Sequence, residues 1–295
     1  MELVALLGPS GSGKTKASIK LAKLLDANIF SLDSLSVFKY VDIASAKPTL
    51  EEREGIRHFG IDVLRPDSTK SNAGFFTTLL YKAIKLSKDK PLIIVGGSSF
   101  FLKAIINGLS IAPMPTKQAL QTYKEVESYP LDYKYKLLSR LDYPYMKKID
   151  RHDTYRINKA LELYIHSRLT PTEYFRLNRP IKFPYKINIF TMGIEKETLK
   201  ANIRLRTKAM LEKGLVDEAR FLLKKYGDKI YPFNTIGLKE TLLYLKGEIG
   251  VDELESMISL NTIKLAKRQT TFNKTQFETR VFEFEEVLKI YRKDM

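Results

Sequence analysis

The stretch Gly8-Pro9-Ser10-Gly11-Ser12-Gly13-Lys14-Thr15 decides the fold of this chain. It matches the pattern G-x-x-x-x-G-K-[ST], and it stands between a short apolar run and a segment with helical periodicity. Glycines in such a loop let backbone N–H groups surround phosphate oxygens at the positive end of the following helix. Lys14 adds a charge, and the Thr15 hydroxyl can bind Mg²⁺. We therefore predict that residues 8–15, the phosphate loop, bind a phosphate compound, whose identity the loop alone leaves open.

Apolar runs on either side of the phosphate loop indicate the fold class. Four runs are short and almost wholly apolar: residues 3–7, 28–32, 92–95 and 187–192. Parallel strands that are covered on both faces have this pattern. Segments with helical periodicity, such as residues 17–25 and 76–84, lie between them. The sequence predicts an α/β fold, a P-loop NTPase-like parallel sheet flanked by helices.

The composition and hydrophobic pattern of the sequence change after Pro113 and Pro115, which interrupt regular secondary structure. The following ~70 residues are charged, rich in Tyr and Lys, and without convincing strands. Asp153 can cap a helix that runs to about residue 167, and Pro171 suits the first turn of another helix. We predict a helical insertion domain over residues 114–185, with residues 1–113 and 186–295 forming the core domain and its helical C-terminal part.

The formal net charge is +16, and it is unevenly distributed. Residues 1–110 carry 15 Lys and Arg against 10 Asp and Glu, whereas the remaining residues carry 35 against 24. The excess therefore lies mostly outside the phosphate-loop segment, which favours a polyanionic partner, with nucleic acid ahead of a membrane surface. A generally basic protein without such a partner remains the alternative on charge alone.

Composition also excludes several classes of protein. The chain has no cysteine, so disulfides and thiolate metal sites are impossible, which fits a reducing cytoplasm. No apolar run approaches the ~20 residues that span a bilayer, and the apolar start over residues 1–7 is too short for a secretory signal. We expect a cytoplasmic protein without a membrane partner.

The ends of two predicted strands carry further information. The run over residues 92–95 ends in Gly96-Gly97-Ser98, where a nucleotide kinase would typically carry an acid, and this counts against a plain kinase or ATPase. Asp33 ends the run over residues 28–32. Because the carboxyl ends of parallel strands face the ligand crevice, Asp33 should lie near the phosphate loop. It could accept a proton from a nucleophile or merely cap a helix.

Taken together, these segments resemble the bacterial tRNA dimethylallyltransferases, also called tRNA isopentenyltransferases, of the IPP transferase family. The resemblance extends in order over residues 8–272. Its pieces are the phosphate loop and residues 33–38, 46–49, 57–62, 96–98, 156–162, 206–215, 236–240 and 266–272.

The resemblance implies a reaction. The dimethylallyl group of dimethylallyl diphosphate passes to the exocyclic amine of the adenosine on the 3′ side of a tRNA anticodon, without ATP hydrolysis. The phosphate loop would then hold the donor's diphosphate, with Mg²⁺ at Thr15. Asp33 would take the amine proton, Ser98 would bond the diphosphate near its bridging oxygen, and Arg206 would stabilise the leaving charge.

The resemblance also implies a tRNA anticodon stem-loop as partner, and we expect the protein to be a monomer. The residues implied to contact the tRNA are Asp33, Ser34, Leu35, Ser36, Ser98, Thr154, Tyr155, Arg156, Ile157, Asn158, Asn234, Gly237, Lys239, Lys267, Arg268, Gln269 and Phe272.

The chain departs from the family pattern at five positions in these segments. Ser36 and Phe38 stand where the family usually has Gln and Tyr, and Ser98, Leu238 and Phe272 stand where it has Thr, Tyr and Trp. Alternative hypotheses are prenyl transfer to free adenine nucleotides, a P-loop metabolite kinase, and an RNA-binding protein without catalysis.

Overall fold

The computed structural model describes residues 1–68, 71–277 and 281–293. The chain forms two compact units, one of residues 1–106 with 184–295 and one of residues 107–183. Unit 1 holds a parallel sheet of strand order β3-β2-β4-β1-β5-β6. The strands are β1 (Leu3–Leu7), β2 (Asn28–Ser31), β3 (His58–Phe59), β4 (Leu92–Gly96), β5 (Ile187–Met192) and β6 (Val281–Phe282). The predicted α/β fold with a parallel sheet is confirmed.

Both faces of the sheet are covered, as the apolar runs predict. All five residues of β1 are buried, and β1 pairs with β4 on one side and with β5 on the other. Val4 and Leu6 pack with helices α1 (Lys14–Leu25) and α13 (Phe284–Lys293) in one core cluster. The alternate residues of β1 point to the opposite face. Helix α2 (Ala73–Ser87), whose Phe76 and Leu80 are fully buried, packs on β2.

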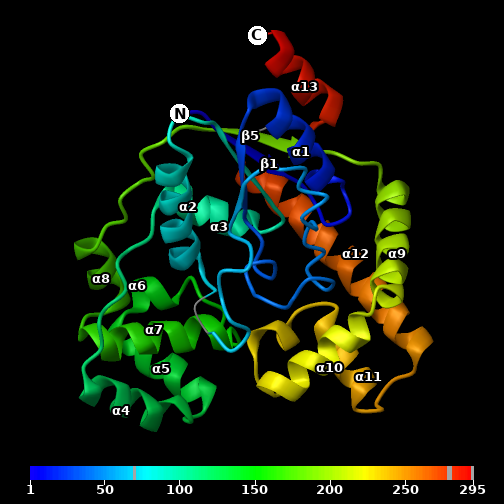
Figure 1. The fold of residues 1–295 in the computed structure, drawn as a ribbon. Helices are drawn as coiled ribbons and strands as arrows, with labels where there is room; N and C mark the ends of the chain where they lie inside the picture. The colour runs from blue at the N-terminus through cyan, green and yellow to red at the C-terminus, as the bar shows by residue number, and fades with distance from the viewer. Residues whose placement is uncertain (69–70, 278–280, 294–295) are drawn as a thin grey trace. The chain divides into compact units, whose positions relative to one another are not determined.

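The C-terminal part of unit 1 is helical. It consists of α9 (Lys196–Glu212), α10 (Leu215–Tyr226), the 3-10 helix η1 (Tyr231–Asn234), α11 (Leu238–Leu245) and the long α12 (Val251–Gln276). Helix α12 lies against both α9 and α11, as Figure 1 shows, and α10 packs on α11. Helix α3 (Ser99–Asn107) follows β4 directly. In the described part of the chain, no helix combines the length and apolar character needed to cross a membrane.

Unit 2 consists of α4 (Lys117–Glu127), α5 (Leu131–Leu141), α6 (Tyr143–Met146), α7 (Thr154–Ser167) and α8 (Pro171–Leu177). Its own core gathers buried side chains of α5, α6 and α7 with Ile149. Asp153 caps α7 by accepting a hydrogen bond from the N–H of Arg156, and Pro171 is the first residue of α8, as predicted.

Unit 2 spans residues 107–183 rather than the expected 114–185. The segment before residue 114 belongs to it because that segment is tied to the end of the unit. The hydroxyl of Tyr174 donates to the carbonyl of Ile111, and a Cβ at Gly108 would lie 2.2 Å from the carbonyl oxygen of Ile181. Such backbone contacts between distant residues leave no trace in hydrophobic periodicity.

Candidate active site

The phosphate loop connects β1 to α1 and adopts the expected turn. Gly11 and Gly13 have φ angles of 86° and 80°, in the left-handed region that favours glycine. The N–H of Ser12 donates to the carbonyl of Pro9 over 3.2 Å, which closes the turn. A Cβ at Gly8 would lie 2.9 Å from the Ser12 hydroxyl, so the loop leaves no room for a side chain there. The backbone N–H groups at the start of α1 therefore remain available to an anion.

Two cationic side chains, those of Lys14 and Arg206, lie close together at this loop. Lys14 Nζ donates to the Pro9 carbonyl over 2.6 Å. Burial and the nearby Arg206 lower the pKa of Lys14 to about 7, and Asp33 acts in the opposite direction. Burial also lowers the pKa of Arg206. Among the residues that the structure describes, none forms an ion pair or hydrogen bond with the Arg206 guanidinium. Two desolvated cations without a protein carboxylate bound to them form a site for an anion.

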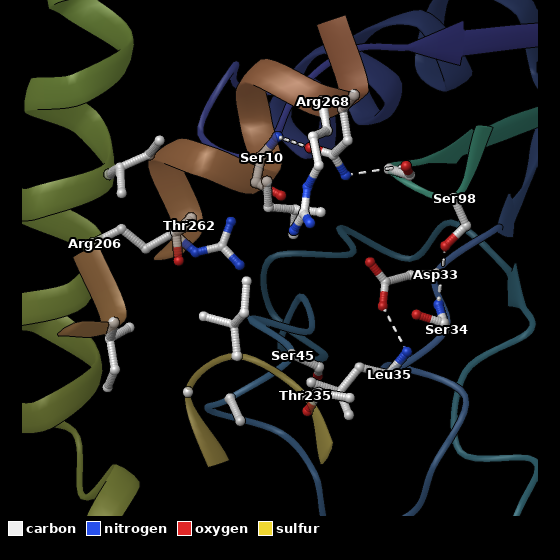
Figure 2. Close-up of a pocket in the computed structure, with 18 of the residues that line it drawn as sticks. Ser10, Asp33, Ser34, Leu35, Ser45, Ser98, Arg206, Thr235, Thr262 and Arg268 are labelled. Carbon is white, nitrogen blue, oxygen red and sulfur yellow. Dashed lines mark hydrogen bonds between the residues drawn. The ribbon is translucent and has the colours of Figure 1, made fainter. Parts of the chain in front are cut away.

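Asp33 lies just beyond β2 and uses its two oxygens differently. Its Oδ1 accepts hydrogen bonds from the N–H groups of Leu35 (2.8 Å) and Ser36 (3.0 Å), so it does cap the following turn. Those bonds fix the carboxylate, and Figure 2 shows it directed into the pocket. Ser98 Oγ accepts from the N–H of Ser34 over 3.3 Å, which brings its hydroxyl beside the Asp33 turn. The capping interpretation of Asp33 is therefore compatible with a role in proton transfer.

Gln269 of α12 joins the phosphate loop to the end of β4. Its Oε1 accepts from the N–H of Ser10 over 2.9 Å, and its Nε2 donates to the carbonyl of Gly97 over 3.0 Å. A Cβ at Gly97 would lie 2.5 Å from that nitrogen, and one at Gly96 would lie 2.1 Å from the carbonyl of Leu32. These close approaches explain why the last residue of β4 and the residue after it are both glycines. Because the amide of Gln269 already bonds the protein at both ends, the residue fits a positioning role better than the predicted tRNA contact.

Two adjoining pockets converge on these residues within unit 1. The smaller, the phosphate pocket, has a volume of about 90 Å³ and includes Lys14, Thr15 and His58 in its lining. The larger, which we call the large pocket, has a volume of about 460 Å³ and is shown in Figure 2. Both pockets share Ser10, Asp33, Ser45, Gly97 and Arg206. Asp33 and Arg206 thus stand where a phosphate site and a larger cavity meet.

The large pocket has an apolar wall and an aromatic edge. The residues that line these parts are Ile203 and Met210 of α9, Ile258 and Leu265 of α12, and Phe100, Phe101 and Phe272. The Phe100 ring is 63% exposed and meets Phe272 edge-on, with 6.2 Å between ring centroids. Sequence reasoning missed all of these except Phe272. Apolar residues at helical spacing indicate a core face equally well, so no signal in one sequence distinguishes them.

The other predicted site residues of unit 1 fall into three groups. Ser34, Leu35, Gly237, Arg268 and Phe272 line the large pocket. Asn234, Lys239 and Lys267 are exposed and line neither pocket. Ser36 is buried, lines only the phosphate pocket and shares a hydrogen bond with Ser31.

The predicted tRNA-contacting stretch 154–158 forms the first turn of α7 in unit 2. Tyr155 is 72% exposed and Thr154 is exposed, as a contact requires. Ile157, in contrast, is fully buried in the core of unit 2, so its side chain cannot reach an RNA. It occupies the inward position of the helical turn, which the family motif does not reveal. Arg156 pairs with Asp153 at an exposed position.

Three residues in the segments that resemble the family contact the protein itself, through packing or a hydrogen bond to the backbone. Phe38 and Leu238 are fully buried, and Phe38 packs on Tyr231, so apolar side chains at these positions belong to the core. His58 shares a hydrogen bond of 2.9 Å with the carbonyl of Ile56, and burial lowers its pKa, which leaves the ring neutral at pH 7.

Comparisons with known proteins agree on one family. The family model described as IPP transferase matches residues 36–276. A tRNA dimethylallyltransferase from Helicobacter pylori is 48% identical over 277 residues, covering 94% of this chain and 88% of the relative. One from Sulfurimonas denitrificans is 46% identical over 281 residues, covering 95% and 94%.

Solved structures of the same family are similar to this chain in fold. The tRNA isopentenylpyrophosphate transferase of Bacillus halodurans superposes with a TM-score of 0.71 at 27% identity, covering 99% of this chain and 94% of that one. A eukaryotic dimethylallyltransferase, solved in a study of its action on tRNA, gives a TM-score of 0.79 at 25% identity, covering 92% and 69%. The chain therefore belongs to the IPP transferase family, as do these tRNA dimethylallyltransferases.

Proposed function

We propose that this protein transfers a dimethylallyl group from dimethylallyl diphosphate to the exocyclic amine of the adenosine that follows a tRNA anticodon. The observation that carries the proposal is the shared boundary of the two pockets. Asp33 and Arg206 line both the phosphate pocket and the large, partly apolar pocket. A donor held by its diphosphate and an acceptor base would therefore meet at these two residues.

The donor's diphosphate fits the phosphate pocket. The N–H groups of the phosphate loop, Lys14 and Arg206 offer positive charge in a site that is partly withdrawn from water. When the bond between the allylic carbon and the diphosphate oxygen breaks, negative charge grows on the leaving oxygens. Preorganised donors stabilise that charge, and each is worth on the order of 3 kcal/mol. The five-carbon tail would lie against the apolar wall formed by Ile203 and Met210.

The acceptor's amine would face Asp33. The amine nitrogen forms a bond to the allylic carbon, the bond from that carbon to oxygen breaks, and the amine proton passes to Asp33 Oδ2. Oδ1 stays bonded to the N–H groups of Leu35 and Ser36 throughout, so the carboxylate does not have to reorient. The hydroxyl of Ser98, fixed beside this turn, would donate to the diphosphate near its bridging oxygen.

The donor set also fits Mg²⁺, which would add positive charge to the leaving diphosphate. Mg²⁺ is usually held by few protein oxygens together with substrate phosphates and water. The Thr15 hydroxyl and the Asp33 carboxylate both line the phosphate pocket. The described residues contain no group of three His, Cys, Asp or Glu side chains suited to a metal. We propose that the Thr15 hydroxyl, the substrate's phosphates and water hold the ion. Binding of diphosphate should therefore tighten when Mg²⁺ is added, in a manner that Thr15→Val abolishes.

Recognition of the tRNA would use basic and aromatic groups around the large pocket. Arg268 can bind phosphate at its rim, and Phe100 and Phe272 offer ring faces on which an extruded base can stack. The exposed residues Asn234, Lys239, Lys267, Thr154, Tyr155 and Arg156 remain proposed contacts to the anticodon stem-loop, as does the half-buried Asn158. We propose that the protein acts as a monomer in the cytoplasm, where tRNA is available as a substrate.

The test is a comparison of acceptors. The protein, dimethylallyl diphosphate and Mg²⁺ are incubated either with an anticodon stem-loop that carries adjacent adenosines or with AMP, and the nucleosides are analysed by mass spectrometry. We expect one five-carbon unit on the RNA and far slower reaction of AMP. If the folded protein binds the RNA yet prenylates only AMP, or neither acceptor, the proposal is wrong.

A further inference from the structure

One loop forms a wall of both pockets. Ser45 lines the large pocket and the phosphate pocket, with Ala44 on one side and Ala46 on the other. The loop around it is bent unfavourably, because Tyr40 and Ala46 have φ angles of 65° and 48°, which residues other than glycine rarely adopt. Such a conformation persists only where the surroundings hold it. The position of Ser45 therefore depends on what fixes residues 38–48, which we call the partition loop.

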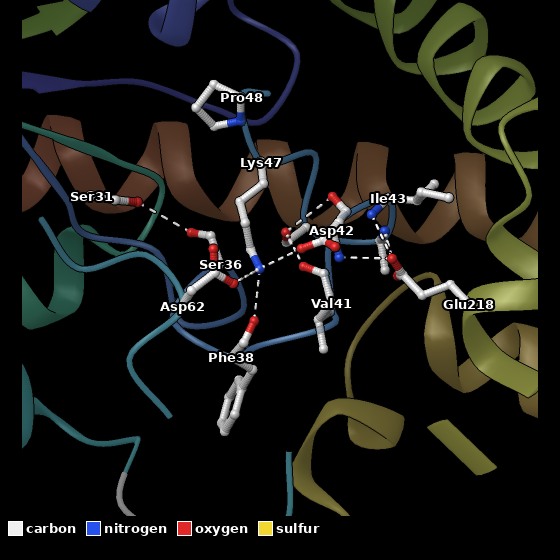
Figure 3. Close-up of polar contacts among 12 residues, drawn as sticks. Ser31, Ser36, Phe38, Val41, Asp42, Ile43, Lys47, Pro48, Asp62 and Glu218 are labelled. Carbon is white, nitrogen blue, oxygen red and sulfur yellow. Dashed lines mark hydrogen bonds and ion pairs between the residues drawn. The ribbon is translucent and has the colours of Figure 1, made fainter. Parts of the chain in front are cut away.

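The partition loop is held internally by Lys47, as Figure 3 shows. The Lys47 side chain is only 3% exposed. Its ammonium group donates to the carbonyl of Phe38 (2.7 Å) and bonds the carboxylates of Asp42 (2.8 Å) and Asp62 (2.7 Å). Asp62 thus has a structural partner in this loop. These bonds close the loop on itself and join it to Asp62, but they do not attach it to the helical part of unit 1.

Glu218 of α10 supplies that attachment. Its Oε2 accepts from the N–H groups of Asp42 and Ile43, each over 2.7 Å, and its Oε1 accepts from the N–H of Ala44 over 3.0 Å (Figure 3). Burial raises the pKa of Glu218, and the three hydrogen bonds act against that change. Glu218 lines neither pocket.

The chain that follows α10 reaches a neighbouring part of the wall of the large pocket. After α10, the chain passes through η1 to residues 235–237, all of which line that pocket. A Cβ at Gly237 would lie 4.0 Å from the Cβ of Ala44, so residues 235–237 adjoin the partition loop. Glu218 therefore ties the partition loop to α10, the helix that precedes this adjoining segment of the wall.

We propose that Glu218 is a positioning residue, which holds Ser45 and Ala46 as the partition between the donor site and the acceptor site. The inference rests on the proposed function for its kinetic consequence. Loss of the carboxylate leaves three consecutive N–H groups without their acceptor. The ring contacts of Tyr40 with Phe221 and of Phe38 with Tyr231 would still hold the start of the loop, but residues 42–46 could then move. The adenosine would then approach the donor in the wrong orientation, while the diphosphate would still be held by the phosphate loop and Lys14.

The experiment compares Glu218→Ala and Glu218→Gln with Asp217→Ala on the complete protein. Asp217 is the neighbouring exposed acid of α10 and pairs with Arg220, so its variant controls for charge loss on this helix. The glutamine side chain keeps one oxygen acceptor, but its NH₂ group faces the third N–H. The effects of Glu218→Gln should therefore lie between those of Glu218→Ala and the wild type. Three quantities are measured: kcat on the stem-loop, the Kd of inorganic diphosphate, and hydrogen exchange of amides 42–44 against those of β1.

We expect kcat of Glu218→Ala to fall about 10- to 100-fold, since a misplacement of about 1 Å can cost on the order of 100-fold. The diphosphate Kd should stay unchanged, and amides 42–44 should exchange faster while those of β1 stay protected. Glu218→Gln should lie between this variant and the wild type, and Asp217→Ala should behave as wild type.

A folded Glu218→Ala protein with kcat within about twofold of wild type would overturn the inference, as would parallel loss of diphosphate binding. If the alanine variant does not fold, the glutamine variant decides in the same way. If wild-type protein does not prenylate RNA at all, the proposed function fails, and the exchange of amides 42–44 still tests the tie made by Glu218.

Discussion

Replacing Asp33 by Asn separates the two functions of this carboxylate. Oδ1 caps the turn after β2 by accepting from two N–H groups. An asparagine side chain of the same shape can keep its oxygen in that place. Its NH₂ group then replaces Oδ2, the atom that would accept the amine proton. The substitution thus removes the base and preserves the turn.

The magnitude follows from that geometry. Loss of a positioned general base typically slows a reaction by about 10²- to 10⁴-fold, which is about 3–5 kcal/mol in the activation barrier. Because the capping bonds survive, thermal stability should change little. Asp33→Ala removes these bonds as well and should additionally destabilise the fold by about 1–3 kcal/mol.

The assay is single-turnover prenylation of the stem-loop with donor already bound, with thermal unfolding measured in parallel. Asp89→Asn, at an exposed turn position, serves as the matched control. RNA affinity should be nearly unchanged in Asp33→Asn. If this variant is folded and turns over within a few-fold of wild type, Asp33 is not the base and the proposed chemistry is wrong.

Three further predictions concern binding. Gln269→Leu removes the amide that joins α12 to the phosphate loop and should weaken diphosphate binding about tenfold, as for a lost bond of ~1.4 kcal/mol, whereas Gln276→Leu on the same helix should not. Because the pKa of Lys14 is lowered to about 7, diphosphate binding at pH 8 should take up close to one proton, seen by calorimetry in buffers of different ionisation enthalpy. Lys14→Arg, always charged, should take up none, and a wild-type protein without uptake would contradict the lowered pKa. Affinity for tRNA should fall steeply with salt, and Lys267→Ala or Arg268→Ala should each reduce the slope by about one, while a flat response would refute the electrostatic contribution.

The main features of the fold could be predicted because they leave local signals. The runs that became β1 and β5 have the predicted bounds, and β2 and β4 differ by one residue at an end. Asp153 and Pro171 mark helix starts through capping and through a fixed φ angle, both of which depend on single residue types. The strands β3 and β6 have two residues each, too few to show periodicity, and they exist only through pairing in the sheet.

The site was predictable where its chemistry requires a particular residue type. The phosphate loop needs glycines and Lys14, and the strand-end rule brings Asp33 to it. The outcome differs for two residues of matching motifs. Ile157 is buried in the core of unit 2, and Gln269, although it lines the large pocket, bonds Ser10 and Gly97 of the protein itself. A motif indicates that a position is constrained, but it does not indicate whether RNA or the protein itself imposes the constraint.

Glu218 illustrates what a single sequence does not contain. Its partners are backbone N–H groups of residues 42–44, and any residue type could supply them. The residue pairs lie more than 170 positions apart in the sequence. Only the three-dimensional arrangement identifies Glu218 as part of the site's support.

The central claim is that the phosphate loop holds a leaving diphosphate while RNA supplies the nucleophile. Its most direct test counts products in one reaction that contains the protein, the stem-loop, Mg²⁺, dimethylallyl diphosphate and radiolabelled ATP. We predict one diphosphate released for each prenylated adenosine, with the ATP left intact. Hydrolysis of the ATP or transfer of its γ-phosphate, without prenylated adenosine, would contradict the account.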